Sequence, residues 1–226
     1  MLNQLVRYVL APLARAVYRP RVEGLDNLPP EGPVIIAANH RAVLDTAVIS
    51  LVARRQVRFL GKAEYFTGRG LRGRLMAGFV DALGFVPVER GNAHAGLAAL
   101  NAGQNVLNAG GVFAIYPEGT RSLDGRLYRG HTGVAVLTLT TGAPVVPVAL
   151  FGTEKLMPRG SRFPRYARIG IRFGAPLEFS AVTERNLRAR RAVTDDVMRA
   201  IRELSQQEYV DTYHRRPEDV RDEGIA

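Results

Sequence analysis

Short apolar runs alternate with stretches of helical periodicity along this chain, and this alternation restricts the fold more than any other feature. Runs that are rich in β-branched residues and bounded by turn residues are typical of buried strands. They cover residues 34–38, 57–60, 84–88, 112–116 and 145–150, and an edge strand is expected at 168–173. Strands that alternate with helices predict an α/β fold, in which helices cover a mixed, mostly parallel sheet.

The stretches between these strands have the spacing of amphipathic helices. Covering helices are expected at residues 42–54, 71–83, 93–109 and 132–140. A last helix is expected to begin at Thr194, because threonine is a favoured N-cap and Asp195 and Asp196 place negative charge in the first turn. The stretch from Ser122 to Arg129 has no apolar period and is expected to be a polar loop.

Polar residues follow three of the strands, and α/β folds bind their ligands beyond the carboxyl ends of strands. They are His40, the pair Glu89 and Arg90, and residues 118–122. Asp45 lies five residues after His40, close enough for its carboxylate to turn back to the imidazole. A histidine held by a carboxylate can act as a general base, because the acid fixes the tautomer and stabilises the imidazolium. This spacing also arises by chance, so the hypothesis depends on the other two clusters.

Residues 68–73 match the glycine pattern of dinucleotide-binding folds, but we reject a nucleotide site there. The pattern requires glycines directly after a strand, whereas residues 62–67 intervene and two arginines occupy the turn. A flexible basic loop explains the stretch better.

Composition excludes several kinds of chemistry. The chain has no cysteine, which excludes disulfides, a thiol nucleophile and cysteine metal sites. Its net charge of +10 indicates an anionic partner such as a lipid headgroup, a phosphorylated substrate or a nucleic acid. Almost all of the basic residues are arginine, so part of this excess can also reflect genomic composition.

The first segment has apolar residues at helical spacing with arginines between them, as in a basic amphipathic helix at a membrane interface. Packing of the same stripe on the domain core is the other interpretation. No apolar run is long enough to span a bilayer, and no signal peptide is recognised. We expect an amphipathic helix at residues 1–20, a single domain at 21–214 and a disordered tail at 215–226.

Four blocks resemble the lysophosphatidic acid acyltransferase family, which includes the bacterial 1-acyl-sn-glycerol-3-phosphate acyltransferases. Residues 39–45 (NHRAVLD) resemble its NH-x4-D block, 84–90 (GFVPVER) its second block, 116–122 (YPEGTRS) its third, normally FPEGTRS, and 145–149 (VVPVA) its fourth. The blocks stand in the family's order. Three residues depart from it: Ala42 replaces a frequent serine, Tyr116 replaces phenylalanine, and Glu89 replaces a frequent aspartate.

The resemblance implies a glycerolphosphate acyltransferase-like fold and direct acyl transfer. His40, oriented by Asp45, is expected to deprotonate the sn-2 hydroxyl of 1-acyl-sn-glycerol 3-phosphate, which attacks an acyl thioester and gives phosphatidic acid for phospholipid biosynthesis. Backbone N–H groups at the start of the following helix are expected to bind the oxyanion. The expected phosphate and glycerol contacts are Arg121, Arg90, Glu118, Gly119, Thr120 and Lys62. For Glu118, a hydrogen bond to the glycerol and a brace for Arg121 are both possible roles.

No metal and no cofactor are expected beyond the co-substrate, an acyl-CoA or an acyl carrier protein thioester. The expected partners are lysophosphatidic acid, this thioester and an anionic membrane surface, with no nucleic acid. The expected location is the cytoplasmic face of the cell membrane, in a peripheral or monotopic form.

Three alternatives remain open. In the first alternative, the enzyme acylates another lysophospholipid or a glycolipid, since the base motif does not define the headgroup of the acceptor. The second is a non-catalytic basic protein that binds membranes or nucleic acid, although the intact His40, Asp45, Glu118 and Arg121 argue against it. The third is a metal-dependent hydrolase with His40, Asp45 and Glu118 as ligands, which the scarcity of histidine and the lack of cysteine disfavour.

Overall fold

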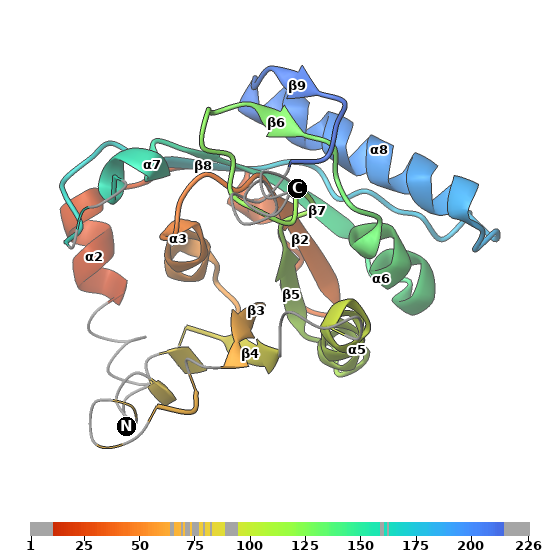
Figure 1. The fold of residues 1–226 in the computed structure, drawn as a ribbon, viewed down its shortest axis with the longest axis horizontal. Coiled ribbons are helices and arrows are strands. Elements are labelled where there is room, and N and C mark those ends of the chain that lie inside the picture. Colours follow the sequence, from red (N-terminus) through yellow and green to blue (C-terminus); the bar gives the residue numbers. More distant parts are fainter. Residues whose placement is uncertain are drawn as a thin grey trace, which may run out of the picture.

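A seven-stranded sheet with helices on both faces forms the centre of the molecule (Figure 1). The computed structural model describes residues 11–63, 66–68, 70, 73, 77–78, 80–81, 83–88, 95–158, 161 and 163–214. The strands of this sheet are β1 (Arg21–Glu23), β2 (Val34–Ala38), β3 (Val57–Lys62), β4 (Phe85–Val88), β5 (Val112–Ile115), β7 (Val145–Phe151) and β8 (Gly170–Phe173). They confirm the predicted α/β class.

The strand order is β1-β8-β7-β2-β5-β3-β4, and every neighbouring pair is parallel except β7 with β8. A second, two-stranded sheet pairs β6 (Leu127–Tyr128) with β9 (Tyr209–Val210) in parallel. The helices are α2 (Ala11–Tyr18), α3 (Asp45–Val52), α5 (Ala95–Asn108), α6 (Gly133–Thr141), α7 (Thr153–Leu156) and α8 (Leu187–Ser205), with a short 3-10 helix, η2 (Leu25–Asn27).

Strand β2 lies in the middle of the sheet and contributes to both cores, because successive side chains of a strand point to opposite faces. Ile36 packs with Val48 of α3 on one face. Ile35 packs on the other face with Leu137 of α6 and Val197 of α8. Helices α2 and α3 thus lie on one side of the sheet and α5, α6 and α8 on the other (Figure 1). Burial on both faces explains why the strand sequences are continuously apolar.

Two predicted helix starts are wrong. Helix α3 begins at Asp45 instead of residue 42. Helix α8 begins at Leu187, because the side chain of Asn186 caps it by accepting a hydrogen bond from the backbone N–H of Ala189 at 2.8 Å. Thr194 lies inside this helix, where its hydroxyl donates to the carbonyl of Arg190 at 2.8 Å.

The strand arrangement also differs from the prediction at two places. Strand β8 is not an edge strand, since β1 pairs with it on its outer side. The stretch expected to be a polar loop contains β6, which pairs with β9 near the C-terminal end of the described chain. Strands β1 and β6, which sequence analysis did not predict, are too short for a recognisable apolar period.

The predicted N-terminal helix is described only in its second half, as α2. The Nε of Arg15 donates to the carbonyl of Leu51 in α3, so α2 packs on the domain, while Leu13 and Val17 are exposed. Residues 1–10, the predicted tail at 215–226 and most of the helix predicted at 71–83 lie outside the described residues. Among the described residues, no helix is both long and apolar enough to cross a membrane.

Two glycines with the same backbone conformation provide a matched test of a close contact. Gly142 and Gly152 have φ angles of 70° and 71°. A Cβ atom on Gly142 would meet no atom within 4 Å, whereas on Gly152 it would lie 2.3 Å from the carbonyl oxygen of Arg168. We expect Gly142→Ala to lower the free energy of unfolding by about 1 kcal/mol, the cost of the left-handed conformation, and Gly152→Ala by about 3 kcal/mol. Urea unfolding measures the free energy of unfolding of both variants. Equal losses would contradict a close contact between a Cβ atom at residue 152 and the Arg168 carbonyl.

Candidate active site

The buried side chain of Asn39 extends the sheet beyond the end of β2. Its Oδ1 accepts a hydrogen bond from the backbone N–H of Leu150 at 2.8 Å, and its Nδ2 donates to the carbonyl of the same residue at 3.2 Å. The Nδ2 also donates to Oε1 of Gln207 at 2.7 Å. These bonds fix the backbone at the point where the chain leaves the strand, directly before His40.

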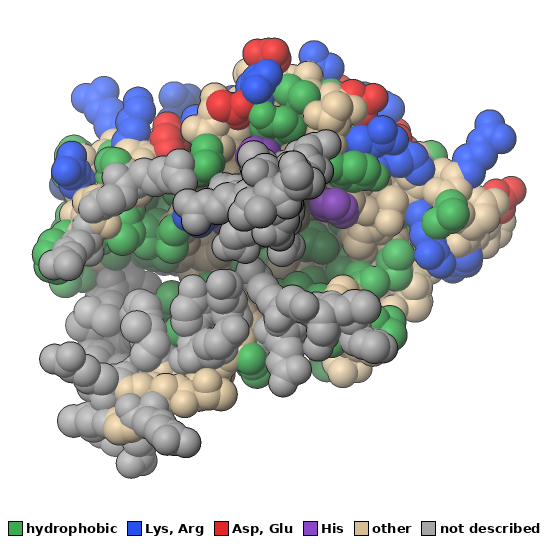
Figure 2. All heavy atoms as spheres, viewed as in Figure 1, with side chains coloured by type: hydrophobic (Ala, Val, Ile, Leu, Met, Phe, Trp, Pro, Cys, Tyr) green, Lys and Arg blue, Asp and Glu red, His purple; other side chains and the backbone are tan. Residues whose placement is uncertain are grey.

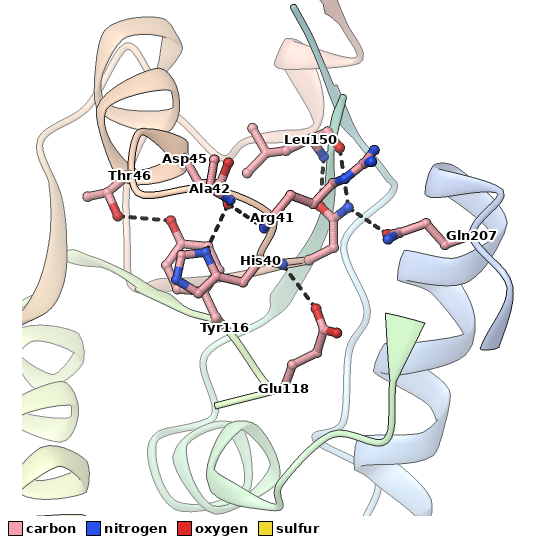
Figure 3. A network of polar contacts seen from close by, with 10 residues as sticks. His40, Arg41, Ala42, Asp45, Thr46, Tyr116, Glu118, Leu150 and Gln207 are labelled. Atoms are coloured by element: carbon pink, nitrogen blue, oxygen red, sulfur yellow. Dashed lines mark hydrogen bonds and ion pairs between the residues drawn. The ribbon is translucent and has the colours of Figure 1, made fainter. Parts of the chain in front are cut away.

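The predicted pair of His40 and Asp45 is in contact. Nδ1 of His40 lies 2.8 Å from Oδ2 of Asp45 (Figure 3). The Asp45 carboxylate is fully buried, while the His40 side chain keeps 19% of its surface exposed. A carboxylate can only accept a hydrogen bond, so Nδ1 carries a proton, and in the neutral imidazole the lone pair is on Nε2. This is the tautomer that a general base requires.

Asp45 Oδ2 also closes the turn between the base and α3. It accepts backbone N–H bonds from Arg41 at 2.6 Å and from Ala42 at 2.8 Å. These bonds hold residues 41–44 outside the helix and explain why α3 begins at Asp45. Backbone N–H groups at the start of the helix after His40 were expected to bind an oxyanion, and that start was predicted near residue 42. The N–H groups of Arg41 and Ala42 donate to Asp45 instead, and the helix starts at Asp45.

Tyr116 supports the other side of the imidazole. Its ring stacks on that of His40, with centroids 3.9 Å apart and planes inclined by 12°. Its hydroxyl lies 3.0 Å from Oγ1 of Thr46. Burial and the nearby Asp45 carboxylate raise the pKa of Tyr116 well above its usual value, so the phenol stays neutral. The phenylalanine of the block that residues 116–122 resemble would lack this hydroxyl contact behind His40.

Glu118 holds two backbone segments together. Its Oε1 accepts the N–H of His40 at 3.0 Å (Figure 3). Its Oε2 accepts the N–H of Tyr128, also at 3.0 Å. The residue is 1% exposed. Burial raises the pKa of Glu118 to about 7, although the two backbone N–H bonds act in the opposite direction. Both carboxylate oxygens are thus bonded to the backbone of the site.

The rest of the third block lies beside the base. The backbone N–H of Ser122 donates to the carbonyl of His40 at 2.8 Å. Arg121 is exposed. Gly119 is exposed and has a φ of 74°, and Thr120 is half-buried. The loop that is bonded to the His40 carbonyl therefore carries an exposed arginine and an exposed glycine.

Two predicted substrate contacts are not placed by the structure. Lys62 ends β3, and its side chain lies outside the described part of the chain. Arg90 lies outside it altogether. Sequence analysis also missed two side chains that contact the site, Thr46 and Gln207. Thr46 directly follows Asp45, but no sequence signal pointed to Gln207.

An apolar pocket of about 160 Å³ lies between α2 and α3. Leu44, directly before Asp45, contributes to its lining, so the pocket begins close to the base. Its lining is formed by Ala14, Tyr18, Pro20, Leu44, Ala47, Val48, Leu51, Leu156, Pro164 and Ile169. A pocket of this composition suits a hydrocarbon chain. Among the described residues, no three His, Asp or Glu side chains are grouped to hold a metal ion.

Comparison with known proteins agrees with the family resemblance of the four sequence blocks. Residues 19–151, more than half of the chain, match a sequence model of the Acyltransferase family. The chain belongs to the Acyltransferase family. The matched range of this acyltransferase-family chain includes His40, Asp45 and the complete third block.

Two plant relatives have the same identity to this acyltransferase-family chain. The chloroplastic 1-acyl-sn-glycerol-3-phosphate acyltransferase LPAT1 of Arabidopsis thaliana is 32% identical over 145 residues, which are 64% of this chain and 39% of the relative. The chloroplastic enzyme BAT2 of Brassica napus, with the same activity in its name, is 32% identical over 145 residues, 64% of this chain and 40% of its own. The chain thus spans about two fifths of the length of these curated relatives.

A solved structure shares the fold. The 1-acyl-sn-glycerophosphate acyltransferase PlsC of Thermotoga maritima superposes with a TM-score of 0.65 and 24% identity, covering 90% of this chain and 78% of that one. This likeness independently supports the mixed, mostly parallel sheet flanked by helices.

The raised pKa of Glu118 predicts a pH dependence of stability. Between about pH 4.5 and pH 7, the folded protein holds a proton on Glu118 that the unfolded chain releases. The contribution of Glu118 to the unfolding free energy therefore falls as pH rises through this window, by up to about 3 kcal/mol. Above pH 7 the carboxyl is ionised in both states and the contribution stays constant.

Urea unfolding of the wild type and of Glu118→Gln between pH 4 and pH 8 measures this contribution. The difference in stability between the two proteins is expected to become less favourable to the wild type as pH rises to 7. A difference that does not change with pH would contradict a raised pKa for Glu118.

Proposed function

We propose that this chain transfers a fatty acyl group from a thioester to the sn-2 hydroxyl of 1-acyl-sn-glycerol 3-phosphate, giving phosphatidic acid. The observation that carries the proposal is the 2.8 Å contact of His40 with the buried Asp45. It stands at the carboxyl end of β2 in a chain of the Acyltransferase family. The activity named for the plant relatives supports the choice of acceptor.

In the proposed reaction, the Nε2 of His40 takes the proton of the sn-2 hydroxyl as its oxygen attacks the thioester carbonyl carbon. The ester bond forms, the carbon–sulfur bond breaks, and the thiolate leaves with the proton that the imidazolium returns. Asp45 stabilises the imidazolium between these steps. The chain has no cysteine and therefore offers no thiol nucleophile for an acyl-enzyme intermediate, which favours direct transfer.

The acceptor phosphate is assigned to the loop of the third block. Arg121 is exposed, and the next residue, Ser122, donates its backbone N–H to the His40 carbonyl. A guanidinium binds a phosphate with two parallel hydrogen bonds. Gly119 and Thr120 belong to the same loop, and Arg90 and Lys62 are further candidates. Glu118 is given a positioning role in this proposal, because both of its oxygens accept backbone N–H groups.

The apolar pocket is assigned to an acyl chain, and the surface beside it to a membrane. Leu13 and Val17 of α2 are 59% and 51% exposed, and Phe163 and Tyr166 are 77% and 70% exposed. Tyr166 stacks on Tyr18 of α2, with ring centroids 6.5 Å apart, so the two segments form one surface. At the left of Figure 2, over α2 and α7, basic side chains lie above hydrophobic ones. Apolar residues bordered by arginine suit an anionic lipid surface.

In this proposal, residues 21–214 form the catalytic domain and residues 1–20 add to the membrane contact. The chain works as a peripheral or monotopic protein on the cytoplasmic face of the cell membrane. The donor is an acyl-CoA or an acyl carrier protein thioester, and no further cofactor takes part. Nucleic acid is not a partner.

Removing the base tests the reaction. We expect His40→Ala to lower acceptor-dependent thiol release from palmitoyl-CoA by about 10²- to 10⁴-fold, because no other group would take the hydroxyl proton. Phosphatidic acid is followed by mass spectrometry, and an acyl carrier protein thioester is the second donor. His40→Gln and the melting temperature control for lost packing against Tyr116. Full activity of His40→Ala would rule out this base.

Replacing Arg121 tests the phosphate contact. A hydrogen bond between charged groups contributes about 1.5–3 kcal/mol, so Arg121→Gln is expected to raise the KM for 1-acylglycerol 3-phosphate about 10- to 100-fold. The KM for 1-acylglycerol, which lacks the phosphate, should not change. Arg199→Gln removes the same charge from the exposed surface of α8 and serves as the control. An equal rise in both variants would mean that Arg121 acts only through net charge.

A further inference from the structure

Gln207 reaches the active site from the far end of the chain. It lies outside the residues 19–151 that match the family. Its Oε1 accepts from Nδ2 of Asn39 at 2.7 Å, and its Nε2 donates to the carbonyl of Gly125, also at 2.7 Å. One side chain therefore connects Asn39, the residue before His40, to the loop that follows the third block.

The direction of these hydrogen bonds is determined by the backbone groups at both ends. The N–H of Leu150 can only donate, so Oδ1 of Asn39 faces it and Nδ2 is left to donate to Gln207. The carbonyl of Gly125 can only accept, so Nε2 of Gln207 faces it. Each amide thus has one orientation that satisfies all of its partners. A thioether or a carboxylate in place of the Gln207 amide could not make both of its hydrogen bonds.

The segment of residues 206–214, here called the C-terminal strap, is fixed on both sides of Gln207. Gln206 turns the chain out of α8 with a φ of 57°. After it, the N–H of Leu127 donates to the carbonyl of Glu208 at 2.8 Å, and β9 pairs with β6. Figure 1 shows β9 beside β6, away from the main sheet.

The end of the strap is held by ring contacts. The ring of Tyr213 stacks on that of His131, with centroids 4.7 Å apart, and the guanidinium of Arg129 lies 5.5 Å from the Tyr213 centroid. His214 stacks on Tyr128, with centroids 4.2 Å apart. Tyr128 is also the residue whose backbone N–H donates to Glu118.

These contacts form a closed path around the base. From His40 it passes through Glu118 to Tyr128 and the strap, and from Gln207 it returns through Asn39 to His40. The strap therefore touches the side chain of Asn39 and also Tyr128, the residue whose backbone N–H is bonded to Glu118.

We propose that Gln207 is a positioning residue of the transferase site, which holds the backbone of Asn39 and His40 in register with the loop after the third block. The catalytic part of this inference rests on the function proposed above. Its positional part concerns backbone order and does not require the protein to be a transferase.

The test compares Gln207→Met, which keeps the length of the side chain and removes both hydrogen bonds, with Gln207→Glu, which keeps the acceptor for Asn39 and removes the donor to Gly125. Glu203→Gln, an exposed change near the end of α8, is the control. The full chain is used throughout. Amide hydrogen exchange is measured for peptides covering residues 39–42 and 118–128, together with kcat, KM and the melting temperature.

For Gln207→Met, we expect faster exchange in both peptides and a kcat about 10- to 100-fold lower, with the KM for the acceptor unchanged, because a displaced base slows the chemical step. For Gln207→Glu, faster exchange should be confined to the 118–128 peptide, with a smaller loss of kcat. Glu203→Gln should match the wild type.

Wild-type exchange in both peptides of Gln207→Met would overturn the positional inference. Faster exchange with an unchanged kcat would overturn the catalytic role. A fall in kcat that follows the fall in melting temperature, with a rise in KM by the same factor, would overturn it as well. If the wild type shows no acyl transfer, the proposed function fails, and the exchange data still decide whether Gln207 orders the loop.

Discussion

The active-site loop depends on one buried carboxylate oxygen, Oδ2 of Asp45, which accepts hydrogen bonds from two backbone N–H groups and the His40 imidazole. A buried charge is tolerated when several donors surround it, and each donor is fixed in return. The oxygen thus closes the turn, sets the first residue of α3 and selects the tautomer of His40. With Tyr116 stacked on its ring, the imidazole is restrained both within its plane and across its face.

The sheet topology brings the contributing segments together. Strands β5, β2 and β7 are parallel neighbours, so their carboxyl ends meet at one edge of the sheet. Beyond that edge, where main-chain pairing ends, the side chains of Asn39 and Glu118 take over the bonding between segments. His40 therefore lies at the end of the central strand of the sheet, and the exposed Arg121 belongs to a loop that is hydrogen-bonded to the His40 backbone.

The sequence predicted most of this centre, because strands buried on both faces must be apolar and the spacing of His40 and Asp45 is local. It failed where local signals compete or are missing. Threonine is a favoured N-cap, and two aspartates follow Thr194. The buried Val193 before it nevertheless belongs to the same helix, which is capped by Asn186. The contact of Gln207 with Asn39 joins residues far apart in the chain, and it depends on how α8 returns across the sheet. No pattern within either segment specifies it.

The backbone of His40 is held on both sides by the third block, since Glu118 accepts its N–H and Ser122 donates to its carbonyl. The first of these contacts joins positions 78 residues apart in the sequence. The segment that carries His40 and the loop that we propose for acceptor binding are therefore coupled to each other. Exchanging the loop for that of a relative, to change headgroup preference, would also replace the support of the base. Such grafts must carry residues 39–45 and 116–122 together.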